Sequence, residues 1–506
     1  MRRVIAAALV LAAAGCSTVP AQPASEVRDG SSPAPAAGSG SIAWGPCTDI
    51  KRPDGEPPAA QDKSVRCGKL AVPLDYAKPD GEKIELALIK LPATGKKKLG
   101  SMVFNFGGPG ASGVDTLDQA AKALTALRAH YDLVSFDPRG VERSSGVRCG
   151  DGAEMDRFTA LDTLPANDET RRATDAANKE FAALCQQHSG KILPYVGTVN
   201  AARDMDRIRE AVGDPKLNYV GMSYGTQLGG VYATLFPKNV GRMVLDAPLD
   251  PTVTFEERTI AQTRGFQKAY ESFLKACVAE GNCEVGKTEA EADANVTRLM
   301  NQLTTKPLQV GGRALTQGLA STGVAAALYS ELTWPFLERA LSEALKGRGD
   351  ALLYLADSYT GRDPNGEYST QMTSFPAITC VDTAERPDEA TLRRTEAAAL
   401  KISPLFGSEG SGGLCSIWPV EGSDEARHVD ATGSAPILVV GGKGDPATPY
   451  EWAPKLTAQL KTATLVTYEG EGHGAYLSGS KCVQGLVDAY LIEGKMPQEG
   501  TTCPAA

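Results

Sequence analysis

The chain has 506 residues, of which 42% are hydrophobic and 22% charged, and its formal net charge at pH 7 is -9. This length and apolar content suit one large α/β domain with an insertion, or several smaller domains. The negative charge argues against nucleic acid or an anionic membrane surface as the main partner. The four histidines form no His-x-x-x-His pair, so we expect no bound metal.

The amino-terminal residues 1–16 are typical of an export signal. Arg2 and Arg3 precede an apolar run that is too short to cross a membrane, and this run ends in AAGC. The ending resembles the lipobox of bacterial lipoproteins, in which Cys16 would carry the lipid; ordinary cleavage in the following VPAQPA is the alternative. Residues 17–43, rich in Ser, Pro, Ala and Gly, are predicted to be a tether. We therefore expect an exported protein, held on the outer face of the cell membrane by the lipid anchor alone or else secreted.

The chain has eleven cysteines, so an even number, ten, remains once Cys16 is set aside. In an exported protein this favours disulfide bonds over metal binding or redox chemistry. Ten cysteines allow many pairings, and sequence alone does not choose among them. Because the cysteines fall along the chain in neighbouring pairs, we predict the bonds Cys47–Cys67, Cys149–Cys185, Cys277–Cys283, Cys380–Cys415 and Cys482–Cys503.

Short apolar runs, each followed by a loop signal, recur along the chain and predict strands buried on both faces of a mostly parallel sheet. A helical pattern at 199–213 lies between two of them, which indicates a doubly wound α/β fold with its first part at 44–250. Residues 251–430 lack a strand series and are predicted to form a helical lid, after which 431–506 complete the sheet. The runs are SMVFNF, YDLVSF, LNYVGM, VGRMVLD, APILVVGG and ATLVTYEG.

The third of these runs leads into G-M-S-Y-G, with Ser223 between Gly221 and Gly225. This matches the nucleophile elbow of α/β-hydrolases, in which a tight strand-to-helix turn exposes the serine and leaves no room for side chains beside it. An ordinary glycine-rich turn is the alternative. We predict that Ser223 is a nucleophile.

Two later strands end at residues that would complete a catalytic triad, Asp445 in GGKGDPATP and His473 in EGEGHG. The chain order Ser, Asp, His is that of α/β-hydrolases. His473 would take the proton of Ser223, and Asp445 would orient the imidazole. Alone, Asp445 is equally well explained as part of a turn, and His473 as a solvated loop residue. The three residues together in this order predict a triad.

The loop after the first apolar run, GGPG, is predicted to supply one donor of an oxyanion hole through the N–H of Gly107 or Gly108. The N–H of Tyr224, directly after the nucleophile, would be the second donor. Another strand ends in DPRG, where we expect Asp137 and Arg139 to brace the loop by an ion pair.

The motifs FNFGGPGASG, DPRG, GMSYGTQLG, GDPATP and GHG together resemble the proline iminopeptidase and tripeptidyl aminopeptidase family of serine peptidases. The resemblance covers about 44–503 and implies the α/β-hydrolase fold, no cofactor, and the same triad and oxyanion donors. Thr448 matches a family position close to the active site. Proline iminopeptidases have a histidine before these glycines, where this chain has Phe106, and this departure favours the tripeptidyl branch.

Enzymes of this family act on peptides with a free amino terminus, so the resemblance implies an acidic group that meets the substrate ammonium. Asp382 and Glu331, both in the predicted lid, are the candidates, and a structural or solvated carboxylate is the alternative for each. The leading hypothesis is a cell-surface serine exopeptidase that releases short peptides, above all tripeptides. A carboxylesterase with the same triad, or an inactive binding protein, are the other hypotheses.

Overall fold

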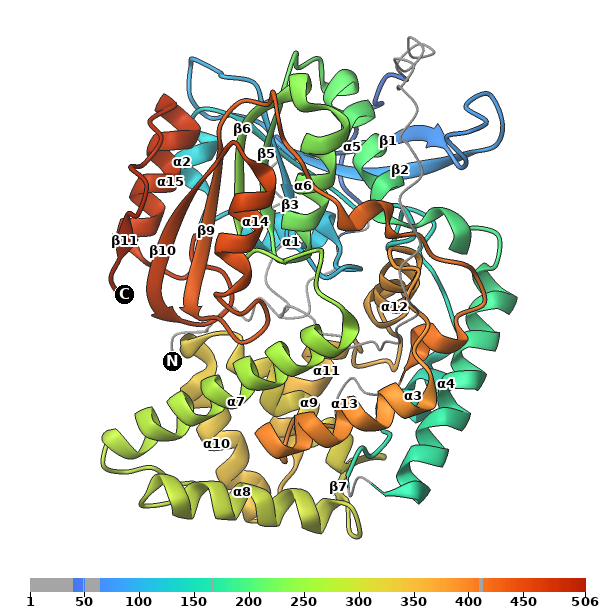
Figure 1. The fold of residues 1–506 in the computed structure, drawn as a ribbon, viewed down its shortest axis with the longest axis vertical. Coiled ribbons are helices and arrows are strands. Elements are labelled where there is room, and N and C mark those ends of the chain that lie inside the picture. Colours follow the sequence, from blue (N-terminus) through green and yellow to red (C-terminus); the bar gives the residue numbers. More distant parts are fainter. Residues whose placement is uncertain (1–39, 49, 51–63, 165–166, 409–412) are drawn as a thin grey trace, which may run out of the picture.

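A computed structural model describes residues 40–48, 50, 64–164, 167–408 and 413–506 of the chain (Figure 1). The predicted signal, Cys16 and most of the tether lie outside the described residues, so those predictions stay untested. In the described ranges no helix is long and apolar enough to cross a membrane. The sheet lies above a group of helices in Figure 1, and the arrowheads of β9 and β10 point toward that group.

The sheet has the strand order β1-β2-β4-β3-β5-β6-β9-β10-β11. In this order all neighbouring pairs from β4 to β11 are parallel. The pairs β1–β2 and β2–β4, at one edge of the sheet, are antiparallel. The six predicted runs form β3, β4, β5, β6, β9 and β10, which confirms the mostly parallel sheet. The strands are β1 (Arg66–Pro73), β2 (Lys83–Leu91), β3 (Ser101–Asn105), β4 (Asp132–Phe136), β5 (Leu217–Met222), β6 (Val240–Asp246), β9 (Ile437–Gly444), β10 (Ala463–Glu471) and β11 (Thr502–Cys503).

Helices cover both faces of the sheet. Alternate residues of each buried strand point to opposite sides, so each strand contributes to two apolar clusters. In β5, Leu217 and Tyr219 belong to one apolar cluster, and Val220 and Met222 to another. The first cluster includes residues of α5, α6 and α14, and the second includes residues of α1, α2 and α15. These helices are α1 (Gly113–Ala120), α2 (Thr125–Arg128), α5 (Thr198–Val212), α6 (Tyr224–Leu235), α14 (Trp452–Leu460) and α15 (Lys481–Glu493).

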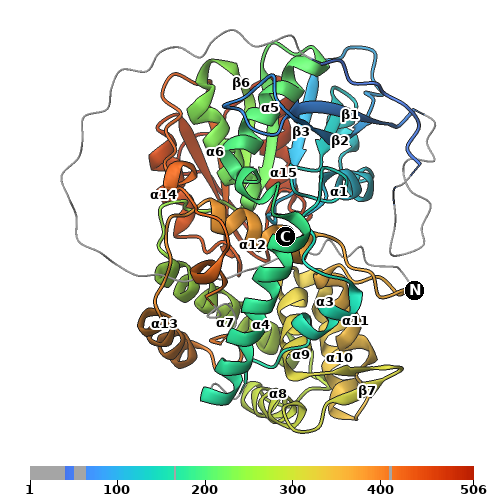
Figure 2. The ribbon, with the colours of Figure 1, turned by 90° about the vertical axis from the view of Figure 1, so that its right-hand side faces the viewer.

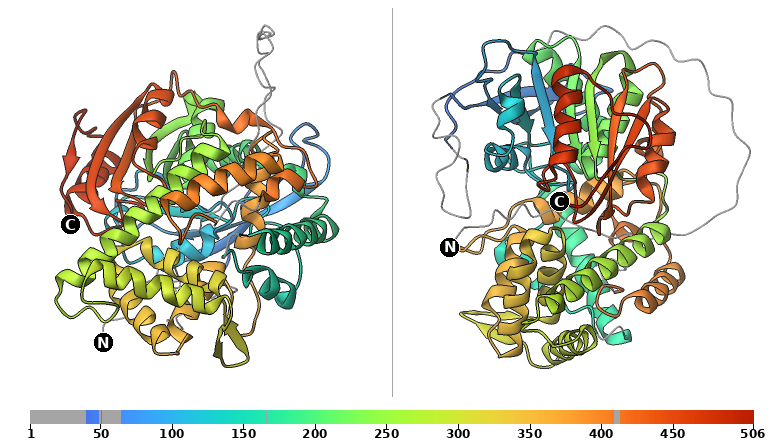
Figure 3. Two further views of the ribbon diagram at one scale, coloured as in Figure 1. Left: turned by 60° about the horizontal axis from the view of Figure 1, so that its bottom comes forward. Right: turned by 90° about the vertical axis from the view of Figure 1, so that its left-hand side faces the viewer.

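Between β6 and β9 the chain leaves the sheet and forms a mostly helical region, here called the insertion. It has an apolar cluster of its own, with Phe266, Phe273, Trp334 and Leu352 among its buried members. In Figure 3 the yellow-green α7 and the orange α13 run side by side across it. Its elements are α7 (Phe255–Ala279), α8 (Glu289–Leu303), the hairpin β7 (Leu308–Val310) and β8 (Arg313–Leu315), α9 (Gln317–Leu328), α10 (Trp334–Leu345), α11 (Asp350–Thr360), α12 (Gln371–Val381) and α13 (Glu389–Ile402).

Two helices from the first part of the chain, α3 (Gly152–Thr159) and α4 (Asp168–Ser189), also lie beside the insertion (Figure 2). Ion pairs join them to it: Arg362 contacts Asp156 at 2.6 Å, and Arg171 contacts Glu396 at 2.7 Å. The sequence-based division places these helices in the sheet domain, whereas in space they extend the helical layer.

Five disulfide bonds join Cys47–Cys67, Cys149–Cys185, Cys277–Cys283, Cys380–Cys415 and Cys482–Cys503. The predicted pairing is confirmed at every bond. Each bond joins cysteines no more than 36 residues apart. The bonds therefore crosslink local segments of the chain, and none of them links the sheet to the insertion in the described residues.

Candidate active site

Ser223 lies at the turn between β5 and α6, at the carboxyl end of a central strand. Its backbone has φ 55° and ψ -123°, a region that residues other than glycine rarely adopt. Neighbouring groups hold this strained conformation. The Ser223 N–H donates to the carbonyl of Asp246 at 2.9 Å, and the Ser223 carbonyl accepts from the Thr226 N–H at 2.8 Å and its hydroxyl at 2.6 Å. The serine is thus fixed at the tip of a tight turn.

The two glycines of the elbow are required by close backbone contacts. A Cβ at Gly221 would lie 2.2 Å from the carbonyl oxygen of Gly225, and a Cβ at Gly225 would lie 2.6 Å from that of Asn105. Side chains cannot be placed at such distances, so the steric reason predicted from the sequence is confirmed for both positions.

Asp445 and His473 meet at the ends of β9 and β10. The His473 Nδ1 lies 2.8 and 2.9 Å from the two carboxylate oxygens of Asp445. An ionised carboxylate only accepts hydrogen bonds, so Nδ1 carries the proton and Nε2 is left as a base. The Nε2 atom is buried and has no hydrogen-bond partner among the described residues. This arrangement leaves one imidazole nitrogen free to accept a proton.

Thr448 holds the Asp445 carboxylate from the following turn. Its N–H donates to Oδ1 at 2.8 Å and its hydroxyl donates to Oδ2 at 2.9 Å, while the Ala447 N–H donates to Oδ1 at 2.9 Å. The hydroxyl also lies 3.4 Å from the His473 Nδ1. Thr448 therefore fixes the acid that orients the histidine, besides lining the pocket described below.

Asp246, which ends β6, is a buried carboxyl group that the sequence analysis did not single out. It accepts hydrogen bonds from the N–H groups of Ala475 at 3.0 Å and Tyr476 at 2.9 Å, in the loop that carries His473. Burial raises its pKa to about 6. Its position directly after an apolar strand run is the same signal that identified Asp445, so the sequence did contain the information needed to find it.

Of the two candidate donors in the GGPG loop, Gly108 fits the oxyanion role better. The Gly107 N–H already donates to the Asn105 side chain at 3.1 Å, whereas Gly108 lines the pocket together with Ser223. The Tyr224 N–H is the first of α6, where N–H groups have no partner within the helix. Phe106, the departure from the family pattern, is buried and stacks on Phe104 at 5.6 Å.

The prediction that Asp137 and Arg139 pair with each other is wrong. Arg139 is completely buried and makes a two-pronged ion pair with Asp204 of α5, both contacts being 2.7 Å. Asp137 instead accepts from the Ser112 hydroxyl at 2.6 Å and lies 3.3 Å from Arg143, and burial raises its pKa to about 6. The loop is braced as expected, but the partners are Asp204 for Arg139, and Ser112 and Arg143 for Asp137, none of which belongs to the motif.

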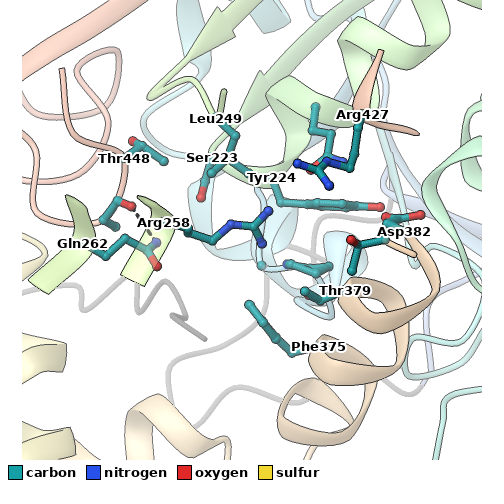
Figure 4. A pocket seen from close by; sticks show the side chains of 15 residues that line it. Ser223, Tyr224, Leu249, Arg258, Gln262, Phe375, Thr379, Asp382, Arg427 and Thr448 are labelled. Atoms are coloured by element: carbon teal, nitrogen blue, oxygen red, sulfur yellow. Dashed lines mark hydrogen bonds between the residues drawn. The ribbon is translucent and has the colours of Figure 1, made fainter. Parts of the chain in front are cut away.

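Ser223 opens into a pocket between the sheet and the insertion, shown in Figure 4, with about 620 Å³ of space that is partly open to solvent. Most of the lining residues come from the elbow and α6, the GGPG loop, α7, α12 and the Asp445 loop. They are Gly108, Pro109, Ser223, Tyr224, Gln227, Leu249, Arg258, Gln262, Phe375, Thr379, Asp382, Thr383, Arg427, Ala447 and Thr448.

The insertion is packed closely against this site through α7. Gln262 donates to the carbonyl of Ala447 at 2.8 Å, and a Cβ at Gly265 would lie 2.3 Å from the carbonyl oxygen of Pro446. From the same helix, Arg258 extends into the pocket, and in the view of Figure 4 its guanidinium group lies between Ser223 and Asp382. No sequence motif pointed to Arg258.

The two acidic candidates differ in position. Asp382 lines the pocket, and its carboxylate accepts the N–H of Thr198 at 2.7 Å and the Thr198 hydroxyl. Burial raises the pKa of Asp382 to about 7, although these hydrogen bonds and Arg258 oppose the shift. Glu331 does not line the pocket; it lies on the insertion, and burial together with nearby Glu471 raises its pKa. The structure thus brings one candidate, Asp382, to the serine.

Comparisons with known proteins agree with this geometry. A family profile described as TAP-like protein matches residues 403–503, which include Asp445 and His473. Serine protease Hip1 of Mycobacterium tuberculosis is 37% identical over 482 residues, which are 91% of this chain and 91% of that protein.

Two further relatives carry different names. Tripeptidyl aminopeptidase of Streptomyces lividans is 32% identical over 455 residues, 87% of this chain and 84% of that protein. Carboxylesterase B of Mycobacterium tuberculosis is 33% identical over 453 residues, 87% of this chain and 86% of that protein. Peptidases and a carboxylesterase therefore occur among proteins similar to this chain over most of its length.

Proposed function

This chain belongs to the TAP-like family of serine hydrolases with the α/β-hydrolase fold, and we propose that it is an exported exopeptidase that releases short peptides, above all tripeptides, from free amino termini. The names of the Hip1 and tripeptidyl aminopeptidase relatives support peptide substrates. The five disulfide bonds support export, since such bonds persist in oxidising compartments. A lipid at Cys16 would hold the enzyme on the cell surface, and cleavage in VPAQPA would release it.

One observation carries the catalytic part of this proposal. The His473 Nδ1 is bound to Asp445, its Nε2 is buried without a partner among the described residues, and Ser223 occupies a strained elbow at the carboxyl end of β5, on the same edge of the parallel sheet. In unliganded enzymes the hydrogen bond between nucleophile and base is often long and tightens only with substrate. The three residues therefore have the environment that a triad requires.

In the proposed reaction the Ser223 Oγ attacks the carbonyl carbon of the scissile peptide bond as His473 Nε2 accepts its proton. The N–H groups of Gly108 and Tyr224 stabilise the oxyanion, and the amino end of α6 adds a favourable dipole. His473 then returns the proton to the leaving amine. Water, activated by the same histidine, hydrolyses the acyl-enzyme and frees the short peptide.

Asp382 is the group we assign to the substrate ammonium, because it is the candidate carboxyl that lines the pocket. Its two oxygens accept from Thr198, and each oxygen has a further lone pair for a donor. An ammonium group placed there would stabilise the ionised carboxylate and lower its pKa from about 7.

Hydrolysis of esters is the second candidate function, favoured by the carboxylesterase relative and by a triad that does not select the acyl group. Chromogenic substrates separate the two: a free tripeptide, the same tripeptide acetylated at its amino terminus, and a short-chain ester. An exopeptidase cleaves only the free tripeptide, and Ser223→Ala lowers that rate by about 10⁴-fold or more. Ester turnover that is indifferent to acetylation would instead establish an esterase, and no Ser223-dependent turnover would favour the inactive binding protein.

A further inference from the structure

Arg258 is a cation in the pocket whose backbone position is well fixed. It lies in the first turn of α7, where Thr254 and Glu257 form reciprocal hydrogen bonds that cap the helix. The Arg258 N–H donates to the carbonyl of Thr254 at 2.9 Å. The side chain lines the same pocket as Ser223, so the helix delivers a guanidinium group beside the proposed nucleophile (Figure 4).

The second arginine that lines the pocket, Arg427, has a full set of ion-pair and hydrogen-bond partners. It contacts Glu385 at 3.1 Å and Asp424 at 3.4 Å, and it also donates to three backbone carbonyls. The Arg258 side chain, in contrast, has no hydrogen bond or ion pair with any of the described residues, and its Nε is buried.

The acidic groups near Arg258 are already engaged by other partners. Glu385 binds Arg427, Asp382 accepts from Thr198, and Asp250 accepts from Gln459 at 2.9 Å. These groups act on Arg258 only through longer-range attraction, and burial outweighs them and lowers its pKa. An arginine nevertheless stays charged in proteins, so the pocket contains a cation that makes no ion pair in the described part of the chain.

A buried charge without a partner opposes folding, and an anionic ligand removes that penalty when it binds. The planar guanidinium matches a carboxylate in two parallel hydrogen bonds. Carboxylates are also the only ionised acids that an unmodified peptide carries. Resting on the peptidase function proposed above, we propose that Arg258 binds a substrate carboxylate near the scissile bond, so that the enzyme prefers peptides with a carboxylate at that position.

Two sources of this carboxylate are possible, an Asp or Glu side chain in the released peptide or the terminal carboxylate of the leaving part. Matched substrates separate them. Tripeptide anilides with Glu or Gln at each of the three positions test the side chain, and free tetrapeptides against their amides test the terminus. At the substrate position that Arg258 contacts, we expect kcat/KM for the carboxylate substrate to exceed that for its neutral partner by about tenfold or more.

The variants are Arg258→Gln, Arg258→Lys and, as a matched control, Arg264→Gln on the same helix. The Arg264 side chain is 61% exposed and does not line the pocket. Arg258→Gln should reduce the carboxylate preference to about one. Arg258→Lys should retain part of the preference, and Arg264→Gln all of it. Since the Arg258 side chain has no partner among the described residues, Arg258→Gln should not lower the melting temperature.

A binding measurement keeps the inference independent of turnover. Calorimetry with the full-length Ser223→Ala protein compares the carboxylate and amide partners of each peptide pair, with and without Arg258→Gln. Tighter binding of the carboxylate that depends on Arg258 supports the inference. If the parent enzyme nevertheless hydrolyses no peptide, that result refutes the proposed function but not this inference. Equal binding of both partners, or a preference that survives in Arg258→Gln, overturns the inference while leaving Ser223-dependent hydrolysis of neutral tripeptides untouched.

Discussion

The sheet side of the pocket and helix α7 of the insertion differ in how their charged side chains are paired. On the sheet side, the Asp445 carboxylate accepts from Ala447, Thr448 and His473, and the Ser223 backbone is held by Asp246 and Thr226. On the insertion side, α7 presents Arg258, whose side chain has no partner in the described part of the chain. The hydrogen bonds to Asp445 orient the catalytic groups before substrate arrives. Arg258, in contrast, would gain a partner only when a ligand binds.

This difference separates two tasks. Loops at the carboxyl ends of parallel strands are short and rigidly anchored, so they place reacting groups accurately. The insertion packs against the sheet domain along α7 and α12, and we expect its helices to determine which substrates reach those groups. Substitutions on the sheet side should therefore reduce turnover of every substrate, while those on the insertion side should change which substrate is preferred.

The largest effect should come from breaking the sheet-side network at its acid. In Asp445→Asn the side chain can donate to the imidazole, which then holds the wrong tautomer, so we expect kcat to fall by about 10⁴-fold with KM little changed. Steady-state kinetics on a neutral tripeptide anilide measures this, and circular dichroism checks the fold. A fall of less than about tenfold would contradict the role we assign to Asp445.

The next effect concerns the backbone that carries the serine. Gly225→Ala would place a Cβ 2.6 Å from the carbonyl oxygen of Asn105, so the elbow must shift. We expect a loss of about 2 to 4 kcal/mol in the free energy of unfolding, together with at least a roughly 100-fold fall in kcat.

Gly485→Ala, in α15, is the matched control. Its Cβ would meet nothing within 4 Å, and the helix should gain about 0.5 to 1 kcal/mol. Urea unfolding and kinetics on both variants check the pair, and equal effects at the two glycines would contradict the steric argument.

Much of the sheet side could be predicted from the sequence, because its signals are local. Apolar runs that end in Ser223, Asp445 and His473 mark strand ends directly, and neighbouring cysteines paired as their spacing suggests. Asp246 also ends one of these runs, VGRMVLD, but the sequence analysis gave it no role.

The insertion side could not be predicted in this way. Arg258 lies in TFEERT, where a charged residue is typical of an exposed helix turn. The packing of α7 against the Asp445 loop, which the sequence does not reveal, directs its side chain toward the pocket. The partner of Arg139 was missed because it is distant in sequence. Asp204 is 65 residues away from Arg139 along the chain, and no spacing rule connects them.

The smallest effect on activity should come from Asp382→Asn, which tests the insertion side against pH. The pKa of Asp382 is about 7 in the folded protein and about 3.9 in an unfolded chain. Folded protein thus keeps a proton that the unfolded chain releases, and this contribution to stability is complete below about pH 4 and is lost as the pH rises to about 7. The amide that replaces the carboxyl group does not titrate, so the variant should gain stability relative to the parent over this window, by about 4 kcal/mol at most. Urea unfolding of both proteins between about pH 4 and pH 8 measures the difference.

The same variant decides whether Asp382 also meets the substrate. If it binds the ammonium, Asp382→Asn raises KM for free tripeptides by about tenfold and leaves kcat near its parent value, since the lost contact forms on binding. Asp162→Asn removes another carboxyl whose pKa is raised by burial but which does not line the pocket, so its KM should stay unchanged. A pH effect on stability without a change in KM would make Asp382 a structural carboxyl that holds Thr198 and would refute its assignment to the substrate ammonium.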